Sequence, residues 1–596
     1  MALKAIPAVP FDVGETLKAA AGLLARKQEL QAAMKELSNI YTIDGVTDSA
    51  HDFLFRESLA DKLDDSVDDV LDDGAQALTE ITGLLHTSPG RMLKRRDQAI
   101  HVADDDVSYG PDLPKTALAL DDPKQWTMSW TNFKDVARDA RIFAERWANT
   151  LTDVHVANET FWPMIAEYGL PFNLLILQEV RPGNVADLER SHGDGWSDVL
   201  QEIYEAGNLY VIDMSIFQHV KPHRADGFDR FTPSTTTFLV QDPTSKSLTP
   251  ISVRVCGHEG PSTYFVPTDP AWLYALQAAK VSITVWGIWL GHVYHWHIVT
   301  AAMQMTMYNF LTDDHPVYQL LEPQSQHLIG FDNVLMLAWK QIGPPTSLTN
   351  PRRYLRLTDR FAQGRDFFDD DPKATLARFG IEESDFSVDE PWDKYPLVGH
   401  LLTVWDATEA YVGVFVQETY PDDASVATDA ALQKWIRKSG QKRKGNVRGL
   451  PLMTSRSALQ DVLTSLVYRI TIHGVTRLNP SLNPAQTFVA NYPPCLQKKE
   501  IPAPDSVIST KELLEYLPRT GVIGKMTQFY YIFVFSSPYE PFIPEGGVED
   551  RLFFDGGAAE PRNAALISFR KEILEFMTSY GGGTPQRGQW PLSVET

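Results

Sequence analysis

The stretch Gly291-His292-Val293-Tyr294-His295-Trp296-His297 is the most informative part of this chain of 596 residues. It places three imidazoles close together, inside a segment from Val281 to Thr312 that contains no Asp, Glu, Lys or Arg. A long uncharged segment of this kind is normally buried, and buried histidines need partners. A transition metal is a partner that can use several imidazoles at once.

The spacing of the three histidines leaves two pairings open. His292 and His295 share a face of an ordinary α-helix, so spacing alone slightly favours this pair. His292 and His297 are splayed by an α-helix, but a single π-type turn returns them to one face. Two interpretations without a metal also stand: core histidines bonded to backbone carbonyls, and a membrane-spanning helix. The second is the weaker, because the segment also carries Gln304 and Asn309.

Composition restricts the classes of function and location. The net charge of −23 argues against binding to nucleic acid or to anionic lipid. The two cysteines, Cys256 and Cys495, form no disulfide framework, so we expect a reducing compartment and a metal held by nitrogen and oxygen atoms. The start of the chain lacks the apolar core of a signal peptide, and we therefore expect a cytoplasmic protein.

The pattern along the chain predicts a mainly α-helical protein with a small β-sheet. Residues 1–105 are acidic, and their apolar residues recur at helical spacing. Short β-rich runs occur at Leu209–Asp213, Thr236–Val240 and Ile251–Val255, with turn residues between them. From Trp272 to about residue 475 the pattern is mainly helical.

Four blocks of sequence together resemble the catalytic domain of the lipoxygenase family. The first is the histidine segment with its continuation Met307-Tyr-Asn-Phe-Leu-Thr-Asp-Asp-His315-Pro-Val-Tyr-Gln-Leu-Leu321. The second block consists of Trp405-Asp-Ala-Thr-Glu-Ala-Tyr-Val, Tyr420-Pro-Asp-Asp and Leu432-Gln-Lys-Trp435. The third consists of Gly449-Leu-Pro, Ser455-Arg-Ser-Ala-Leu-Gln-Asp, His473 and Asn491-Tyr-Pro-Pro494. The fourth is the end of the sequence, Pro591-Leu-Ser-Val-Glu-Thr596. Their order and spacing hold from roughly residue 155 to residue 596.

This resemblance implies the domain organisation. Residues 106–596 are expected to form a lipoxygenase-like helical domain around a long central helix, with the β-rich runs forming its small sheet. The β-sandwich that usually precedes this domain is not visible, and residues 1–105 form a helical region instead, as in some bacterial members. That region has two interpretations: a lid over a channel mouth, or a replacement for the β-sandwich.

The resemblance also implies a set of metal ligands. His292 and His297 match the family's first two histidines, which overrides the preference from spacing and predicts a π-type turn between them. His473 matches the third histidine, and the terminal carboxylate of Thr596 matches a further ligand. His295 then becomes a neighbour of the metal site. Such a mixed nitrogen and oxygen site suits iron, with manganese as the alternative.

Three positions depart from the family pattern. Arg477 occupies the place of a fourth ligand, where a guanidinium has no lone pair to offer. Val293 replaces the glutamine that usually follows the first histidine, so the surroundings of the metal differ. Leu335 occupies the position of a small residue that governs the placement of oxygen, and a leucine there would crowd the oxygen pocket.

The implied function is that of a non-haem iron dioxygenase that inserts O2 into a polyunsaturated fatty acid and yields a lipid hydroperoxide. The departures support two alternatives. One is a metalloenzyme of the same fold with diverted chemistry, either hydroperoxide rearrangement or oxidation of a substrate other than a fatty acid. The other is a metal-free lipid-binding descendant. We expect a monomer with an unsaturated fatty acid or related lipid and O2 as partners, without nucleic acid or a transmembrane segment; peripheral membrane contact stays open.

Overall fold

The computed structural model describes residues 161–162, 165, 178–181, 184–185, 188–190, 197–325, 351–381, 395–476, 493–509, 512–517 and 547–580, except 219, 226–227, 245–246, 259, 443, 494 and 514. The predicted N-terminal region 1–105 lies outside the described residues, as do Leu335, Arg477 and Thr596. The predictions made for them remain predictions.

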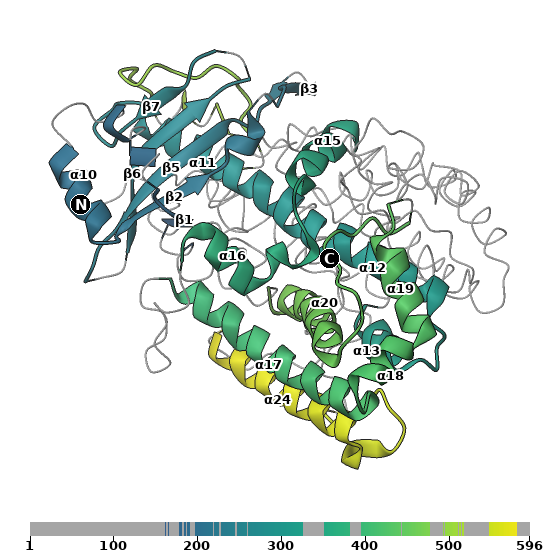
Figure 1. Cartoon of the computed structure of the whole chain (residues 1–596). Helices are drawn as coiled ribbons and strands as arrows, with labels where there is room; N and C mark the ends of the chain where they lie inside the picture. The colour runs from purple at the N-terminus through teal and green to yellow at the C-terminus, as the bar shows by residue number, and fades with distance from the viewer. Residues whose placement is uncertain are drawn as a thin grey trace, which may run out of the picture.

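A five-stranded antiparallel sheet forms one end of the described structure (Figure 1). Its strands lie in the order β1-β2-β5-β6-β7, with bounds β1 Gln178–Glu179, β2 Leu209–Asp213, β5 Ser234–Gln241, β6 Leu248–Cys256 and β7 Thr263–Phe265. Val211 lies opposite Phe238 in the β2–β5 pair and Thr237 opposite Val253 in the β5–β6 pair, whose register shifts between Phe238 and Leu239. The three predicted strand runs are therefore confirmed.

The alternation of side chains along β2 fills two separate layers of core. Leu209 and Val211 join a small cluster under helix α10 (Ser197–Glu205), whereas Tyr210 and Ile212 face the main core. Successive side chains of a strand point to opposite faces, so both faces of this sheet are covered. Helix α11 packs against β5 and β6 and joins the sheet to the helical body.

The uncharged segment forms the middle of one long helical rod. Helix α11 (Trp272–Trp286) runs without a break into a π-helical segment, η3 (Gly287–Ile298), and then into α12 (Val299–Phe310). Most of its described side chains are buried on every side, as expected of a helix that is apolar all round. The long central helix that the resemblance implied is confirmed.

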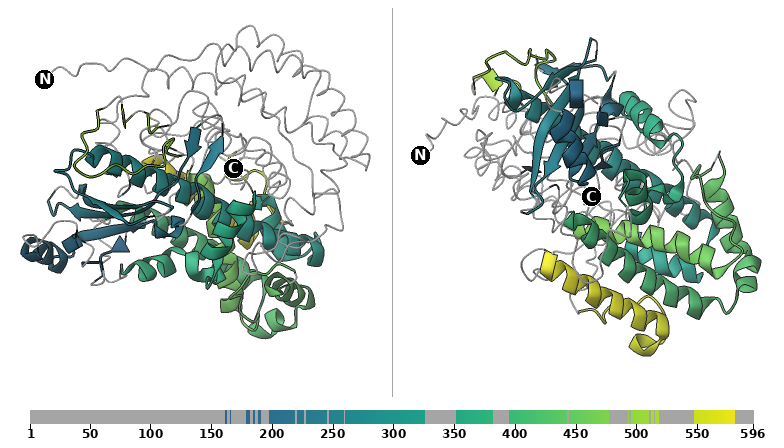
Figure 2. Two further views of the ribbon diagram at one scale, coloured as in Figure 1. Left: turned by 90° about the horizontal axis from the view of Figure 1, so that it is seen from above. Right: turned by 60° about the vertical axis from the view of Figure 1, so that its left-hand side comes forward.

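Several of the remaining described helices pack directly against this rod, and α24, the yellow helix in the two views of Figure 2, lies farther out. Helix α17 packs against α20 and α24 over much of its length, and α19 packs against α12. Their bounds are α13 Pro316–Ser325, α15 Pro351–Ala362, α16 Pro372–Phe379, α17 Pro396–Thr419, α18 Asp423–Thr428, α19 Ala430–Gly440, α20 Arg456–Thr476 and α24 Pro561–Tyr580. Short elements are the 3-10 turns η2 (Ser215–Phe217), η4 (Phe367–Asp370) and η6 (Gly557–Ala559), and the β3–β4 hairpin (His223–Ala225, Phe228–Arg230). The predicted mainly α-helical class with a small sheet is confirmed.

One helical stretch in the described structure has the length and apolar character of a membrane span. It runs from Trp272 to His292, and 88% of its most apolar window is buried inside the protein. A buried core helix has the same composition, so this stretch is weak support for a membrane span.

Candidate active site

The π-helical segment brings His292 and His297 together. The backbone N–H of Val299 donates to the carbonyl of Tyr294, a bond between residues five apart. This wider turn places such residues on one face, and the Nε2 atoms of His292 and His297 face each other at 3.0 Å. Both side chains are buried, and their rings meet edge to face. The predicted π-type turn is present.

This separation fits a hydrogen bond between the two rings and also fits two ligands of one ion. Metal–nitrogen bonds of about 2.1 Å, with an angle near 90° between them, place the two nitrogen atoms about 3 Å apart. His295 does not pair with His292, because its ring contacts Asp370 instead. The assignment of His292 and His297 as metal ligands remains a prediction.

The third predicted ligand lies on a helix that touches this segment. His473 belongs to α20, close to the end of that helix, and α20 packs against the π-helical segment. Its side chain lies outside the described part of the structure, as does that of Val293. Among the described residues, no group of three or more His, Cys, Asp or Glu side chains is gathered so that it could hold a metal.

His295 points away from the histidine pair and into a polar cluster. Its Nδ1 lies 3.0 Å from Oδ2 of Asp370, and Arg365 pairs with the other oxygen of that carboxylate. Burial lowers the pKa of His295, although Asp370 opposes this effect. Burial alone would raise the pKa of Asp370, but its contacts with His295 and Arg365 lower it well below the ordinary value. A neutral ring therefore donates its Nδ1–H to an ionised carboxylate.

A second buried acid lies directly beside Asp370. Asp371 accepts a hydrogen bond from Ser465 at 2.6 Å, and its Oδ1 lies 3.6 Å from Arg469 of helix α20. Burial raises the pKa of Asp371 to about 7, although Arg469 and Ser465 act in the opposite direction. Arg469 also donates to the carbonyl of Phe367 at 2.5 Å. These contacts tie the short turn η4 to α20.

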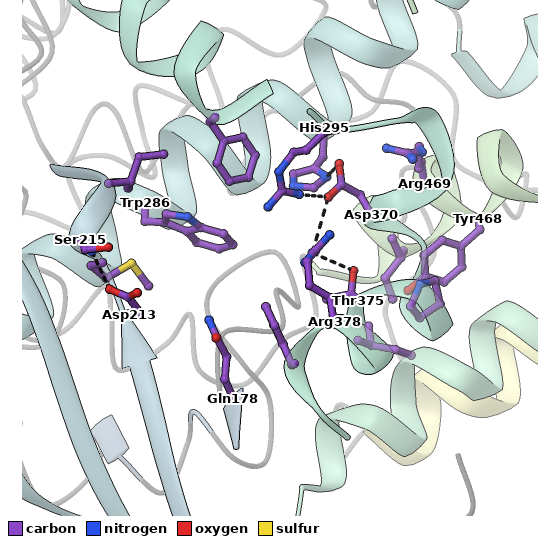
Figure 3. A pocket seen from close by; sticks show the side chains of 18 residues that line it. Gln178, Asp213, Ser215, Trp286, His295, Asp370, Thr375, Arg378, Tyr468 and Arg469 are labelled. Carbon is purple, nitrogen blue, oxygen red and sulfur yellow. Dashed lines mark hydrogen bonds and ion pairs between the residues drawn. The ribbon is translucent and has the colours of Figure 1, made fainter. Parts of the chain in front are cut away.

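A cavity of about 270 Å³ opens beside this cluster (Figure 3). Neither His292 nor His297 lines it, so the cavity lies on another side of the central rod from their facing nitrogens. Its polar lining comes from His295, Asp370, Asp213 and three arginines, one between α15 and η4, one in α16 and one in α20. Its apolar lining comes from η2, α11, α15, α17 and α20. The lining includes Asp213, Ile216, Trp286, His295, Phe361, Arg365, Asp370, Thr375, Arg378, Leu401, Arg469 and Ile472.

Sequence analysis did not identify the members of this cavity other than His295. The signal that could have drawn attention to them is the run Asp369-Asp370-Asp371, which directly follows two phenylalanines. Such a charge run is usually a solvated surface. Here the side chains of Asp370 and Asp371 are buried, and each is matched by an arginine: Asp370 by Arg365, five residues earlier, and Asp371 by Arg469, which lies far away in the sequence.

Comparison with known proteins agrees with the family that the sequence resembles. Residues 382–529 match the profile of the lipoxygenase family. The polyunsaturated fatty acid lipoxygenase ALOX15B of Rattus norvegicus is 25% identical over 326 residues, which cover 52% of this chain and 45% of the relative. The hydroperoxide isomerase ALOXE3 of Homo sapiens is 26% identical over 253 residues, which cover 40% of this chain and 34% of that protein.

A solved lipoxygenase structure in complex with arachidonate has the same fold. It superposes with a TM-score of 0.64 at 17% identity, covering 85% of this chain and 81% of that one. The alignments with the two curated relatives span less than half of their lengths. The profile match over residues 382–529, the relatives and the shared fold all support a catalytic domain of the lipoxygenase family.

Proposed function

We propose that this chain is a non-haem iron dioxygenase that inserts O2 into a polyunsaturated fatty acid to give a lipid hydroperoxide. Membership of the lipoxygenase family supports an oxidoreductase in general terms. The observation that carries the proposal is the π-helical segment, which brings the Nε2 atoms of His292 and His297 to within 3.0 Å of each other in a buried setting.

The residues fit an iron ion. Two imidazole nitrogens supply part of the mixed donor set that non-haem iron accepts. His473 and the carboxylate of Thr596 would complete the set that the resemblance implies, and manganese is the alternative ion. When bound, iron would supply the one-electron oxidation that removes a hydrogen atom from a bis-allylic methylene of the lipid.

The chain's own contribution is a dry and apolar setting for that chemistry. The rod around the two histidines carries no formal charge from Val281 to Thr312, and most of its described side chains are buried. Excluding water protects a reactive lipid radical from side reactions. His295 does not compete as a ligand, because its ring is held by Asp370.

A second candidate is a metalloenzyme of the same fold with diverted chemistry, namely hydroperoxide rearrangement or oxidation of a substrate other than a fatty acid. Arg477 at the fourth-ligand position, Val293 beside the first histidine and Leu335 at the oxygen-pocket position favour it. The similarity to a hydroperoxide isomerase also supports it. A metal-free lipid-binding descendant is the third candidate.

The ligand assignment is tested by the metal content of matched variants of the central rod. We expect His297→Ala to lose most of its bound iron, because removing one imidazole removes a ligand. His295→Ala is the control from the same segment and should keep its iron, because its ring bonds to Asp370 instead. Elemental analysis of protein with an unmodified C-terminus provides the measurement, and iron retained in His297→Ala would refute the assignment.

Substrate tests separate the three candidates. O2 uptake with linoleate or arachidonate, accompanied by conjugated-diene absorbance, supports the dioxygenase. Consumption of a fatty-acid hydroperoxide without O2 uptake supports diverted chemistry. Absence of metal from the untouched protein supports the lipid-binding descendant.

We further propose that the protein acts as a cytoplasmic monomer with an unsaturated lipid and O2 as partners. The arachidonate complex of a protein with the same fold supports the proposal of a lipid partner.

A further inference from the structure

Helix α19 and the turn after it carry a concentration of positive charge that is unusual for this chain. From Ala430 to Gln460 there are eight Lys or Arg and no Asp or Glu, whereas the whole chain has a net charge of −23. Six of the eight lie within residues 434–444, and one of these, Arg443, lies outside the described residues. Figure 1 shows α19 at the outer side of the described helices.

Five described side chains form this positive surface. Lys434 and Arg437 are exposed and Lys438 is partly buried, and their spacing of three and four residues places them along one side of the helix. Lys442, which is exposed, and Lys444 follow in the turn. These five side chains are called the basic stripe below.

Within the described residues, no carboxylate lies within ion-pair distance of the basic stripe. The contacts of its charged atoms are with neutral groups. The ammonium of Lys438 donates to Oε1 of Gln441 at 2.8 Å, and that of Lys434 lies 4.9 Å from the centre of the Phe310 ring. Like charges four residues apart on a helix, such as Lys434 and Lys438, repel each other. The stripe therefore holds positive charge that an anionic partner could neutralise.

The helix dipole explains only part of this stripe. Cations are favourable in the last turn of a helix, where Arg437 and Lys438 lie. Lys434 lies before that turn, and Lys442 and Lys444 follow the end of the helix at Gly440. Because the effect of the dipole falls off within one turn, it does not account for these three lysines.

The turn after α19 is folded back tightly against the helix. The backbone N–H of Gly445 donates to the carbonyl of Lys438 at 3.1 Å, and that of Val447 donates to the carbonyl of Ser439 at 2.9 Å. A side chain at Gly445 would overlap the backbone of Ser439. The backbone that carries the stripe is therefore fixed before any partner binds, which lowers the entropic cost of association.

We propose that the basic stripe is a docking site for an acidic peptide segment of a partner protein. Charge complementarity favours this occupant. A membrane or a nucleic-acid duplex would also face the neighbouring surface of a protein whose net charge is −23, and exposed charges interact over about 8 Å at physiological ionic strength. A short acidic segment meets the stripe alone. This surface is independent of the proposed oxygenase function.

Fluorescence anisotropy of a labelled glutamate-rich peptide with the full chain tests the proposal. The same peptide with glutamine in place of glutamate is the uncharged probe. We expect the glutamate peptide to bind and the glutamine peptide to bind at least about tenfold more weakly. The double substitution Arg437→Gln and Lys442→Gln should lower the affinity for the glutamate peptide by about fivefold or more, because it removes two cations of the stripe.

The matched control removes two exposed cations elsewhere, through Arg360→Gln in α15 and Lys571→Gln in α24. It changes the net charge by the same amount, so it should bind the glutamate peptide as wild type does. Circular dichroism and thermal unfolding show whether both double variants are folded. Should the stripe variant fail to fold, Lys442→Gln alone changes only an exposed side chain beyond the end of α19 and should still weaken binding.

The outcomes either support this docking site or overturn it. Failure of the glutamate peptide to bind, equal affinity of the two peptides, or an equal loss in the control variant would overturn the proposal. Phosphatidylserine vesicles and a DNA duplex are the competing ligands. Tighter binding to either of them than to the peptide, lost in the stripe variant, would assign the surface to a membrane or a nucleic acid instead. Because anisotropy needs neither metal nor turnover, failure of the proposed oxygenase function leaves this test unaffected.

Discussion

Asp370 is the residue on which the polar cluster beside the cavity depends. Its two oxygens meet His295 and Arg365, and its side chain is only 3% exposed. A buried charge that loses its partner is far more costly than an exposed one, because water cannot replace the lost contact. The members of this cluster therefore stabilise one another, and we expect a substitution of one member to affect the stability contributed by the others.

We expect Asp370→Asn to lower the free energy of unfolding by about 3 kcal/mol, because it leaves the partly buried Arg365 without its carboxylate. Urea denaturation of the two proteins provides the measurement. Glu515→Gln is the control: it breaks a pair with Lys498 in which both side chains are more than a third exposed. That change should cost less than about 1 kcal/mol. Equal losses in the two variants would contradict this account.

Asp371 should make stability depend on pH. Burial raises its pKa from 3.8 to about 7, so the folded protein holds this proton more tightly than the unfolded chain does. The resulting stabilisation is fully present below pH 3.8 and is lost as the pH rises to about 7. We expect Asp371→Asn to gain stability relative to wild type across that range, as measured by denaturant unfolding at several pH values.

The comparison needs a control that removes a carboxylate elsewhere. Asp505→Asn changes an exposed position and should follow the wild-type pH dependence. A constant difference between Asp371→Asn and wild type at every pH would show that the pKa of Asp371 is the same in the folded and unfolded states.

Among the secondary-structure elements, η4 lies close to the turn at Gly449, because the residue before η4 contacts this glycine. Gly449 has a positive φ of 74°, and a side chain added there would meet Asp366 inside van der Waals contact. Gly364 has a similar φ of 77° but open space around the corresponding position. Comparing the same substitution at the two glycines therefore distinguishes the energetic cost of backbone strain from that of steric overlap.

We expect Gly449→Ala to destabilise the protein by clearly more than Gly364→Ala. Both variants bear the backbone strain of a left-handed residue, about 1 kcal/mol, and Gly449→Ala also displaces Asp366. Thermal unfolding of the two variants provides the comparison. Similar melting temperatures would mean that the turn yields to the added methyl group.

Sequence patterns predicted these elements to different degrees. The β-strands and the helical region after Trp272 followed from local composition and periodicity. The π-type turn did not, because the spacing of His292, His295 and His297 favours an ordinary helix; only the resemblance predicted it. The pairing of His295 with Asp370 joins residues that are far apart in sequence, so no local pattern contains it.

At the scale of the whole molecule, the joint between the sheet and the central rod, meaning the place where β5 packs on α11, includes a small buried polar contact. The Ser282 hydroxyl lies 2.9 Å from that of Thr235 and 3.0 Å from the carbonyl of Pro233. Both Thr235 and Ser282 are buried. The contact links strand β5 to α11 and so fixes the position of the sheet against the helical body.

We expect Ser282→Ala to lower the free energy of unfolding by about 1–3 kcal/mol, because it leaves the buried Thr235 hydroxyl without this partner. Thr428→Ala is the control, since its hydroxyl bonds within the exposed helix α18. Denaturant unfolding of both variants checks the expectation. A loss in Thr428→Ala as large as that in Ser282→Ala would argue against a special role for the joint.

The widened turn between Gly287 and Ile298 has a consequence for how this chain tolerates changes in length. A turn closed by a bond between residues five apart holds about one residue more than an ordinary α-helical turn. Deleting one residue in this stretch would therefore let the helix close normally and would leave Val299 to Phe310 near their present orientation, with α12 still against α19. The same deletion inside α12 would rotate the residues after it by about 100°. We therefore expect the widened turn to accept the loss of one position more readily than the ordinary helices on either side of it.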